Sequence, residues 1–227
     1  YIQAQDVIME NDVRDIRDEN PEEAPGRDKF GHFHLGFGFA ASPPEGNGLE
    51  IEYGFSHSFH FGYLRKYRLK GPLEAGFGID YFYEHFRIKQ TDEKLLPDPA
   101  GHDKETLKFD NLDASVFLRI RIGKSGRNVG NFVDAAGYGG WVFSALHETE
   151  DENVIENAGL TTVIHSDLEY ANAINYGAML RVGLNRWALN VRYRLSDYLD
   201  DTFENTDPNA DARLPRLNVG LQWGVHK

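Results

Sequence analysis

The sequence has no cysteine among its 227 residues. Disulfide bonds, thiolate metal sites and lipid-modified cysteines are therefore excluded within it. It also has no run of 18 apolar residues, so no membrane-spanning helix is expected. Basic residues are in deficit, since 24 lysines and arginines stand against 36 aspartates and glutamates, a net charge of −12. Binding to nucleic acid needs clustered lysine and arginine, so we expect no nucleic-acid partner.

What the sequence has in abundance is alternation of apolar and polar residues. Successive side chains of a β-strand point to opposite faces, so a period of two marks a strand with one apolar face. The pattern predicts strands over residues 32–41, 49–63, 73–84, 112–122, 168–184, 187–195 and 217–225. Residues 131–147 form an eighth candidate, less regular because Val142 and Leu146 break the alternation.

The aromatic faces of these strands do not fit inside a small barrel. Eight strands enclose a space that ordinary side chains only just fill, and the apolar faces carry most of the aromatic rings. The opposite faces carry glycine, serine, asparagine and charges of both signs, which suit a narrow polar lumen. Outward-facing rings are normal where lipid is the solvent. We therefore predict an all-β fold: an eight-stranded antiparallel up-and-down transmembrane β-barrel in the outer membrane of a Gram-negative bacterium, rather than a lipocalin-like soluble barrel.

The connections between the predicted strands alternate in length and in charge. The long polar loops at 90–106, 147–166 and 197–213 hold 16 acidic and 3 basic residues. The segments that border the short turns, 65–70, 119–127 and 181–186, hold 10 basic residues and no acidic one. Outer-membrane barrels have short periplasmic turns and long extracellular loops, and basic residues near the inner leaflet meet anionic phospholipid. We therefore expect both the N- and C-termini to be periplasmic.

Tyrosine and tryptophan are expected to form girdles at the two membrane interfaces. Trp187 and Trp223 fall at the predicted periplasmic end of their strands. Tyrosines fall nearer the outer end: Tyr81, Tyr83, Tyr170 and Tyr193.

Turning the polar faces inward places a set of charges inside the barrel. The acids are Glu50, Glu52, Glu74, Asp80, Glu84, Asp113 and Glu169, and the bases are Arg119, Arg121, Arg181, Arg192, Arg194 and Arg216. Isolated buried charges are costly, so we expect these groups to pair in a lumen charge network. Such a plug leaves no wide channel, and porin activity needs roughly 16 strands. Acids in a cleft are also candidates for catalysis, but a structural network is the commoner role.

Histidines offer the remaining candidates for chemistry. His32, His34 and His60 face the predicted lumen and could gather as metal ligands, although hydrogen-bonded lumen histidines are commoner. His57 faces outward, as in lipid-modifying outer-membrane enzymes, but Ser56 and Ser58 point inward, so a nucleophile would have to come from a neighbouring strand. We assign no catalytic residue, no cofactor and no metal, and expect no enzyme.

The last long loop carries a short run of oxygen-bearing side chains. Asp207, Asn209 and Asp211 resemble calcium ligands, but the glycine and the distal glutamate of an EF-hand loop are missing. A weak divalent bridge to lipopolysaccharide and a plain solvated loop are the two interpretations.

The first 29 residues differ in composition from the rest. Residues 6–29 carry nine acidic and four basic residues with few large apolar ones. Such a segment cannot bury enough surface to offset the entropy lost on ordering. We expect an acidic periplasmic N-terminal arm over residues 1–29, disordered or docked on a partner, and a barrel over residues 30–227. Residues 1–5 either end a secretory signal or begin the mature chain.

In these features the chain resembles the small outer-membrane barrels of Bacteroidota, the PorT-like or OmpA-like β-barrel family. The residues that carry the resemblance are Phe-Gly-Phe (37–39), Ala-Gly-Phe-Gly-Ile-Asp-Tyr (75–81), Leu-Arg-Ile-Arg-Ile (118–122) and Leu-Asn-Val-Gly-Leu-Gln-Trp (217–223). The chain departs from the pattern at its end, where Val225-His226-Lys227 replaces the usual terminal aromatic residue. The resemblance implies a structural or accessory role, as in secretion machinery.

Three functional hypotheses follow. The first is a non-enzymatic accessory subunit of a larger envelope complex, which contacts other envelope proteins through its arm and its barrel wall. The second is a free-standing OmpX-like surface barrel with acidic extracellular loops. The third, with least support, is a lipid-modifying enzyme. In each case the immediate surroundings are outer-membrane lipid and lipopolysaccharide.

Overall fold

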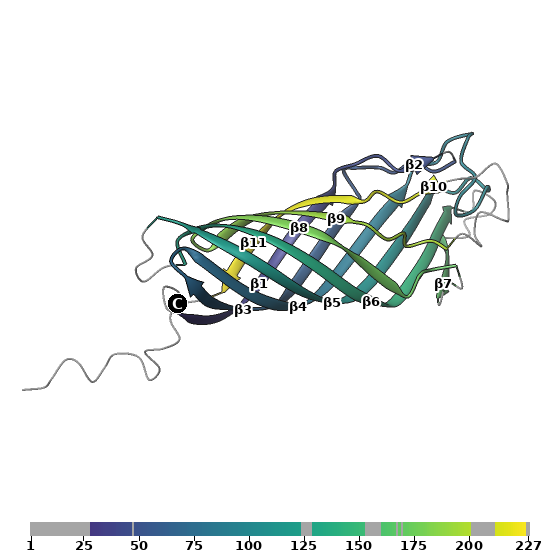
Figure 1. Ribbon diagram of the computed structural model, residues 1–227. Coiled ribbons are helices and arrows are strands. Elements are labelled where there is room, and N and C mark those ends of the chain that lie inside the picture. The colour runs from purple at the N-terminus through teal and green to yellow at the C-terminus, as the bar shows by residue number, and fades with distance from the viewer. Residues whose placement is uncertain are drawn as a thin grey trace, which may run out of the picture.

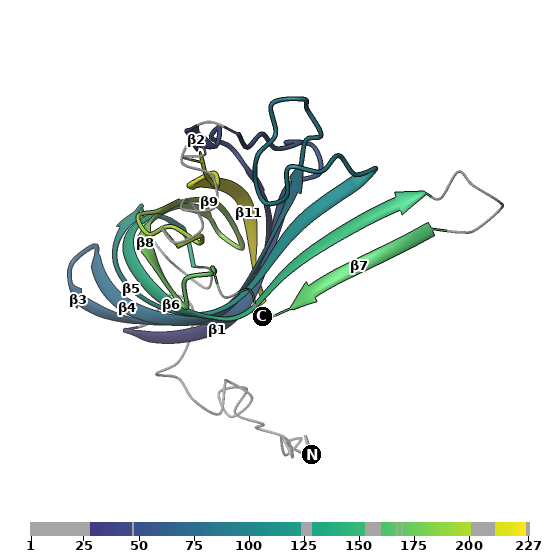
Figure 2. The same cartoon turned by 90° about the vertical axis from the view of Figure 1, so that its right-hand side faces the viewer.

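The computed structural model describes residues 28–46, 48–123, 129–152, 160–166, 168, 170–200 and 212–225. Eight antiparallel strands form a closed ring in these residues (Figures 1 and 2): β1 (Lys29–Ala40), β3 (His57–Lys70), β4 (Leu73–Ile88), β5 (Lys104–Ile122), β6 (Asn131–Glu152), β8 (Ile174–Leu184), β9 (Trp187–Arg194) and β11 (Leu217–Val225). The ring closes where β1 pairs with β11. The predicted all-β, eight-stranded barrel is confirmed. None of the described residues belongs to a helix long and apolar enough to cross a membrane.

The two ends of the barrel differ in their connections. At one end, called the turn end, lie short links such as the glycine turn between β3 and β4, where Gly71 has a φ of 58°, and the two-residue link at Asn185. The first and last barrel residues, Lys29 and Val225, lie at this end. At the other, the loop end, the connections are long, and β2 (Glu45–Gly46) pairs with β10 (Ala212–Arg213).

The outer wall of the barrel is apolar on all eight strands. Large hydrophobic side chains remain exposed along it, among them Val116 (68% exposed), Phe33 (65%) and Trp141 (58%). The neighbouring residues of the same strands are buried, as the strict alternation along β8 shows. This apolar belt needs an apolar surrounding, because soluble monomers rarely expose contiguous apolar surface on this scale.

The strand predicted over residues 49–63 is divided in two. β3 begins only at His57, and a turn at Glu52–Ser56 precedes it, in which the Ser56 amide donates to the Glu52 carbonyl oxygen at 2.9 Å. From Ile51 to His57 is six residues, whereas their partners on β4, Ile88 and His85, are three apart. The segment before β3 therefore has three more residues than the segment of β4 opposite it. An odd difference exchanges the inward and outward sides of a strand, so residues 49 and 51 point inward and residues 50 and 52 outward.

The irregular strand over 131–147 is regular on either side of a β-bulge. On β5, Asp110 and Asn111 are adjacent, but their partners on β6 are Ser144 and Val142, so Phe143 is the extra residue. Val142 is therefore buried before the bulge, and after it residues 145 and 147 are the buried ones. The bulge explains why Leu146 broke the predicted alternation.

The predicted loop over 147–166 contains an ordered β-hairpin. β6 runs on to Glu152 and pairs with β7 (Leu160–Ser166). Figure 2 shows this pair leaving the ring as an arm at the loop end. The predicted strand over 168–184 accordingly begins only at Ile174, and before it the Ala171 amide donates to the Leu168 carbonyl oxygen at 2.9 Å, as in a turn.

Apolar side chains close the interior at both ends. At the loop end, residues from several strands and loops form a buried cluster, called the loop-end cluster: Ala40, Leu49, Ile51, Phe86, Ile88, Leu96, Leu107, Phe109, Val142, Ala145, Tyr198, Leu199 and Leu214. A smaller turn-end cluster consists of Phe30, Val129, Phe132 and Ala188. Polar side chains fill the interior between the two clusters.

Candidate functional site

The lumen between the two clusters is lined by the polar faces of the eight strands. Alternation turns every second residue inward, so charged side chains from neighbouring strands meet in the interior. Buried charges need partners. The polar side chains here lie in layers along the barrel axis.

The layer nearest the turn end is built around Glu74 of β4. Lys66, across the β3–β4 pair, donates to both carboxylate oxygens of Glu74 at 2.8 and 2.9 Å. Arg121 of β5 lies 3.7 Å from the same carboxylate. Lys66 and Glu74 are both buried, whereas Arg121 is partly exposed. Lys66 was not among the predicted lumen charges, although its place on the polar face of its strand could have identified it.

In the next layer one carboxylate serves two arginines. Asp134 of β6 accepts a bidentate pair of hydrogen bonds from Arg119 at 2.6 and 2.9 Å, and Nε of Arg181 on β8 lies 3.1 Å from Oδ2, the oxygen that also accepts from Nη2 of Arg119. All three groups are buried. The guanidinium of Arg119 also lies 3.5 Å from the centre of the Phe132 ring. Arginine suits this place because its planar group both pairs with a carboxylate and stacks on a ring.

A third layer surrounds Arg192 of β9. Its guanidinium donates to Asp113 at 2.5 Å and lies between two rings, 3.9 Å from the centre of Phe82 and 3.5 Å from that of Tyr138. Asn175 connects this layer further, since it donates to Asn111 at 2.6 Å. The arginine is thus neutralised by one acid and held flat between aromatic faces.

Nearest the loop end, a residue from the last long connection completes the filling. Tyr198 donates to Glu84 at 2.6 Å and stacks on Phe109, with ring centroids 4.2 Å apart. Arg194 lies 3.2 Å from Glu84 and donates to the backbone carbonyls of Leu214 and Pro215. Loop segments therefore enter the barrel and bind its last charged pair. Periodicity could not have located Tyr198, because it lies outside the barrel strands.

A second charged cluster at the loop end was also missed from sequence. Glu105 is fully buried and is contacted by Lys94, by His147 at 2.7 Å and by Gln90 at 3.0 Å. Lys94 and Gln90 come from the loop after β4, and His147 faces inward only because of the bulge in β6.

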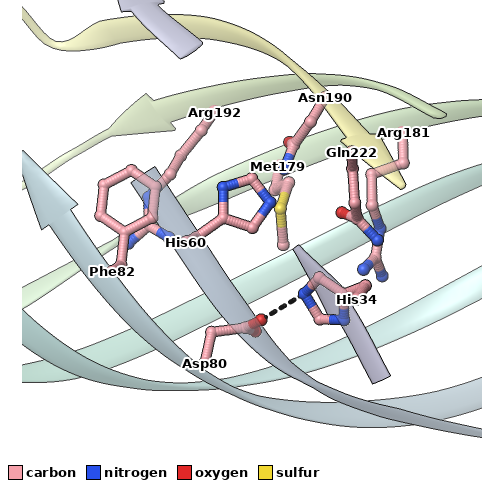
Figure 3. A pocket seen from close by; sticks show the side chains of 9 residues that line it. All are labelled: His34, His60, Asp80, Phe82, Met179, Arg181, Asn190, Arg192 and Gln222. Carbon is pink, nitrogen blue, oxygen red and sulfur yellow. Dashed lines mark ion pairs between the residues drawn. The ribbon is translucent and has the colours of Figure 1, made fainter. Parts of the chain in front are cut away.

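A small pocket lies among these layers in the described part of the lumen (Figure 3). Nine side chains line it, and His34 contacts Asp80 there at 2.6 Å. His60 lies beside His34, with ring centroids 5.7 Å apart. The space has room for about one water molecule. A space of this size is too small for an organic substrate.

Several predicted lumen charges lie elsewhere. Glu50 is exposed and bound to Lys89 at 2.8 Å, and Glu52 lies 3.0 Å from Arg87 on the outside, both because the turn at 52–56 reversed the faces. Arg216 lies at the loop-end rim, where it binds Asp197 at 2.8 Å. Glu169 lies outside the described residues. Arg121 is partly exposed at the turn end, and the interior holds the others: Glu74, Asp80, Glu84, Asp113, Arg119, Arg181, Arg192 and Arg194.

Most of the predicted interface aromatic residues lie on the outer wall, and one does not. Trp187 and Trp223 are cross-strand partners at the turn end, with ring centroids 6.4 Å apart. Tyr193 is 41% exposed on the wall, and the Tyr81 hydroxyl donates to Asp110 beside the partly exposed Tyr83. Tyr170 differs from the prediction, because it packs against the loop-end cluster instead of facing outward.

The histidine candidates form no metal centre among the described residues. No group of three or more histidines, aspartates or glutamates there is arranged to hold an ion. His32 stacks on Phe30, with ring centroids 5.2 Å apart, away from the His34–Asp80 contact. Asp207, Asn209, Asp211 and residues 1–27 lie outside the described residues.

Comparison with family models identifies the family of the chain. A family model described as an outer membrane protein beta-barrel domain matches residues 29–197, which is more than half of the chain. No curated protein matches the chain in sequence. The match begins at the first residue of β1 and ends in the connection after β9.

Proposed function

The chain belongs to the outer membrane protein β-barrel domain family, and on that basis we propose that it is a non-enzymatic accessory subunit of a larger envelope complex in the outer membrane. The observation that carries the proposal is the filling of the described lumen: buried ion pairs lie between two apolar clusters, and the pocket beside His34 has room for about one water molecule. A barrel without a passage acts through its surfaces. Those surfaces are the wall, the loop end and the N-terminal segment.

We also propose an orientation in which the turn end faces the periplasm. The short links and both barrel termini lie together at this end, as outer-membrane barrels require. Because the chain has no cysteine, single cysteines can report the topology. A membrane-impermeant maleimide should label Ser166→Cys on intact cells and Lys70→Cys only after the outer membrane is opened. The reverse labelling would overturn the orientation.

The proposed complex is tested by cross-linking and affinity purification of the full chain from membranes. We expect defined envelope proteins to co-purify, and fewer of them with a variant that lacks residues 1–27. Recovery of the barrel alone, with and without those residues, would refute the accessory role. Membership in the PorT-like group of Bacteroidota and a part in secretion machinery are finer proposals, which the identity of such partners would decide.

The projecting hairpin favours a second candidate, an OmpX-like surface barrel. β7 stands last in the strand order, and its exposed residues include Val163 and Ile164. An edge strand of this kind is a template for pairing with another chain. Shortening the hairpin should then change surface adhesion while leaving any co-purifying complex intact.

Lipid modification has the least support. Ser56 and Ser58 are buried, so His57 has no outward hydroxyl beside it on β3. Deletion of the protein should leave the lipid A profile unchanged, and an altered profile would revive the enzyme hypothesis.

A further inference from the structure

Two histidines face each other on the outer wall near the loop end. His57 of β3 and His85 of β4 are direct cross-strand partners, two residues along the strands from the Phe59–Tyr83 pair. Both are partly exposed, and their ring centroids lie 4.7 Å apart with the planes inclined by 29°. Neither belongs to the lumen network described above.

One backbone carbonyl fixes the protonation pattern of both rings. Nδ1 of His57 lies 2.9 Å and Nδ1 of His85 lies 3.1 Å from the carbonyl oxygen of Phe55. A carbonyl oxygen only accepts hydrogen bonds, so each Nδ1 must carry the proton. In the neutral rings the lone pair then belongs to Nε2 on both histidines.

This arrangement is typical of histidines that bind metal ions. A ligating histidine almost always donates its other ring N–H to a carbonyl or a carboxylate, which orients the ring. Two nitrogens on one zinc ion lie at most about 4 Å apart, twice the Zn–N distance of about 2.0–2.1 Å. The ring centroids lie 4.7 Å apart with stacked planes, so the two side chains must rotate until both Nε2 atoms point at one ion within that limit.

We propose that His57 and His85 bind one divalent transition-metal ion through their Nε2 atoms, with water at the remaining positions. The described chain adds no third histidine, aspartate or glutamate in ligating position, so the site is open, unlike a closed structural zinc site. Imidazole ligands favour zinc, copper and nickel over magnesium and calcium.

The neighbouring charges are compatible with a bound cation. Lys108 is the cross-strand partner of His85, but Glu148 pairs with it, and Glu150 pairs with Lys104 further along β5. On the other side of the pair, Phe37 stacks on His57 with ring centroids 5.7 Å apart. The phenyl ring supports the imidazole from one side and competes for no ligand position.

Titration of the full chain in detergent micelles tests the site, after chelator treatment, with zinc, nickel or magnesium chloride. We expect one zinc or nickel ion per chain and no binding of magnesium. His57→Gln and His85→Gln should each weaken zinc binding at least as much as the roughly 10–100-fold that loss of an outer-shell partner costs. His165→Gln, at an exposed histidine of β7, is the matched control and should bind as the parent does.

A second measurement keeps the test independent of how the variants fold. Nitrogen NMR of the parent protein should show both rings protonated at Nδ1, and zinc should shift the two Nε2 resonances. Absence of zinc binding by the parent overturns the proposal. So does unchanged binding in variants whose heat-modified migration on gels shows a folded barrel.

Discussion

At the scale of single residues, the interior depends on arginines that are both paired and stacked. Arg119 and Arg181 share Asp134, and Arg192 lies between two aromatic rings while it binds Asp113. Each arrangement replaces lost hydration with hydrogen bonds and a ring face, which a buried charge requires. A lysine could supply the charge but neither the bidentate geometry nor the stacking.

Asp134 is the residue whose loss should cost most. Replacing it with alanine would leave two buried guanidinium groups without their shared acceptor, and breaking a buried pair typically costs about 3–5 kcal/mol. We expect Asp134→Ala to lower the free energy of unfolding by that order. Urea titration in lipid vesicles, followed by tryptophan fluorescence and by gel migration, measures the change.

Glu50 provides the matched control. It was also predicted to lie in the lumen, yet its pair with Lys89 is exposed on both sides. Exposed pairs contribute about 0–1 kcal/mol, so Glu50→Ala should hardly move the unfolding midpoint. Equal losses in the two variants would contradict the assignment of one pair to the interior and the other to the surface.

At the scale of elements, two odd insertions decide which residues face inward at the loop end. The turn at 52–56 reverses the phase of the segment before β3, and the bulge at Phe143 reverses that of β6. Each insertion exchanges polar and apolar faces. The result is an interior whose loop end combines the apolar loop-end cluster with the buried Glu105, Lys94 and His147.

Deleting Phe143 should restore the register that the bulge breaks. Residues beyond the deletion would then exchange faces, and His147 would turn outward, away from Glu105. Glu105 would lose one of its buried partners, which costs on the order of 1–3 kcal/mol or more. We expect a lower unfolding midpoint, with weaker protection from hydrogen exchange confined to the ends of β5 and β6. Deletion of Phe143 without any loss of stability would show that the bulge has no such role.

The far end of the projecting hairpin, where Asp151 contacts His102 of the loop before β5, should respond to pH. Burial opposes the charged form of His102, but the hydrogen bond and charge of Asp151, together with Asp98 and Glu105, outweigh it and raise the pKa of His102. A raised pKa means that the contact adds stability below the ordinary value of about 6.5. That contribution is lost as the pH rises through the raised pKa.

Hydrogen exchange measures this effect at two backbone amides. Those of Asp103 and Glu152 donate across the same junction. After correction for intrinsic rates, their protection should be greater at about pH 5.5 than at about pH 8.5, because these values lie on either side of the ordinary pKa of a histidine. In Asp151→Asn the difference should shrink, and an identical difference in that variant would exclude the ion pair as its cause.

At the scale of the whole molecule, much of the architecture followed from sequence periodicity. The positions of Glu74, Asp113 and Arg119 could be predicted because each lies in an uninterrupted run of alternating residues. Glu50 and Glu52 could not, because the three extra residues between Ile51 and His57 reverse the faces without interrupting the alternation in the sequence. Tyr198 and Lys94 reach the interior from loops, where no period constrains direction. Sequence therefore predicted the cylinder well and its loop-end filling poorly.

The layered filling also predicts how the whole barrel behaves toward ions. A passing ion would have to cross the turn-end cluster, the charged layers and the loop-end cluster in turn, and apolar constrictions exclude water. In planar bilayers the purified protein should show no steady conductance, against a large porin as the positive control. Truncating the loop-end cluster with Phe109→Ala and Leu107→Ala should not open a channel, because the layers around Arg192 and Asp134 remain closed. A persistent conductance in the parent protein would contradict the closed lumen, and with it the inference that this barrel acts through its surfaces.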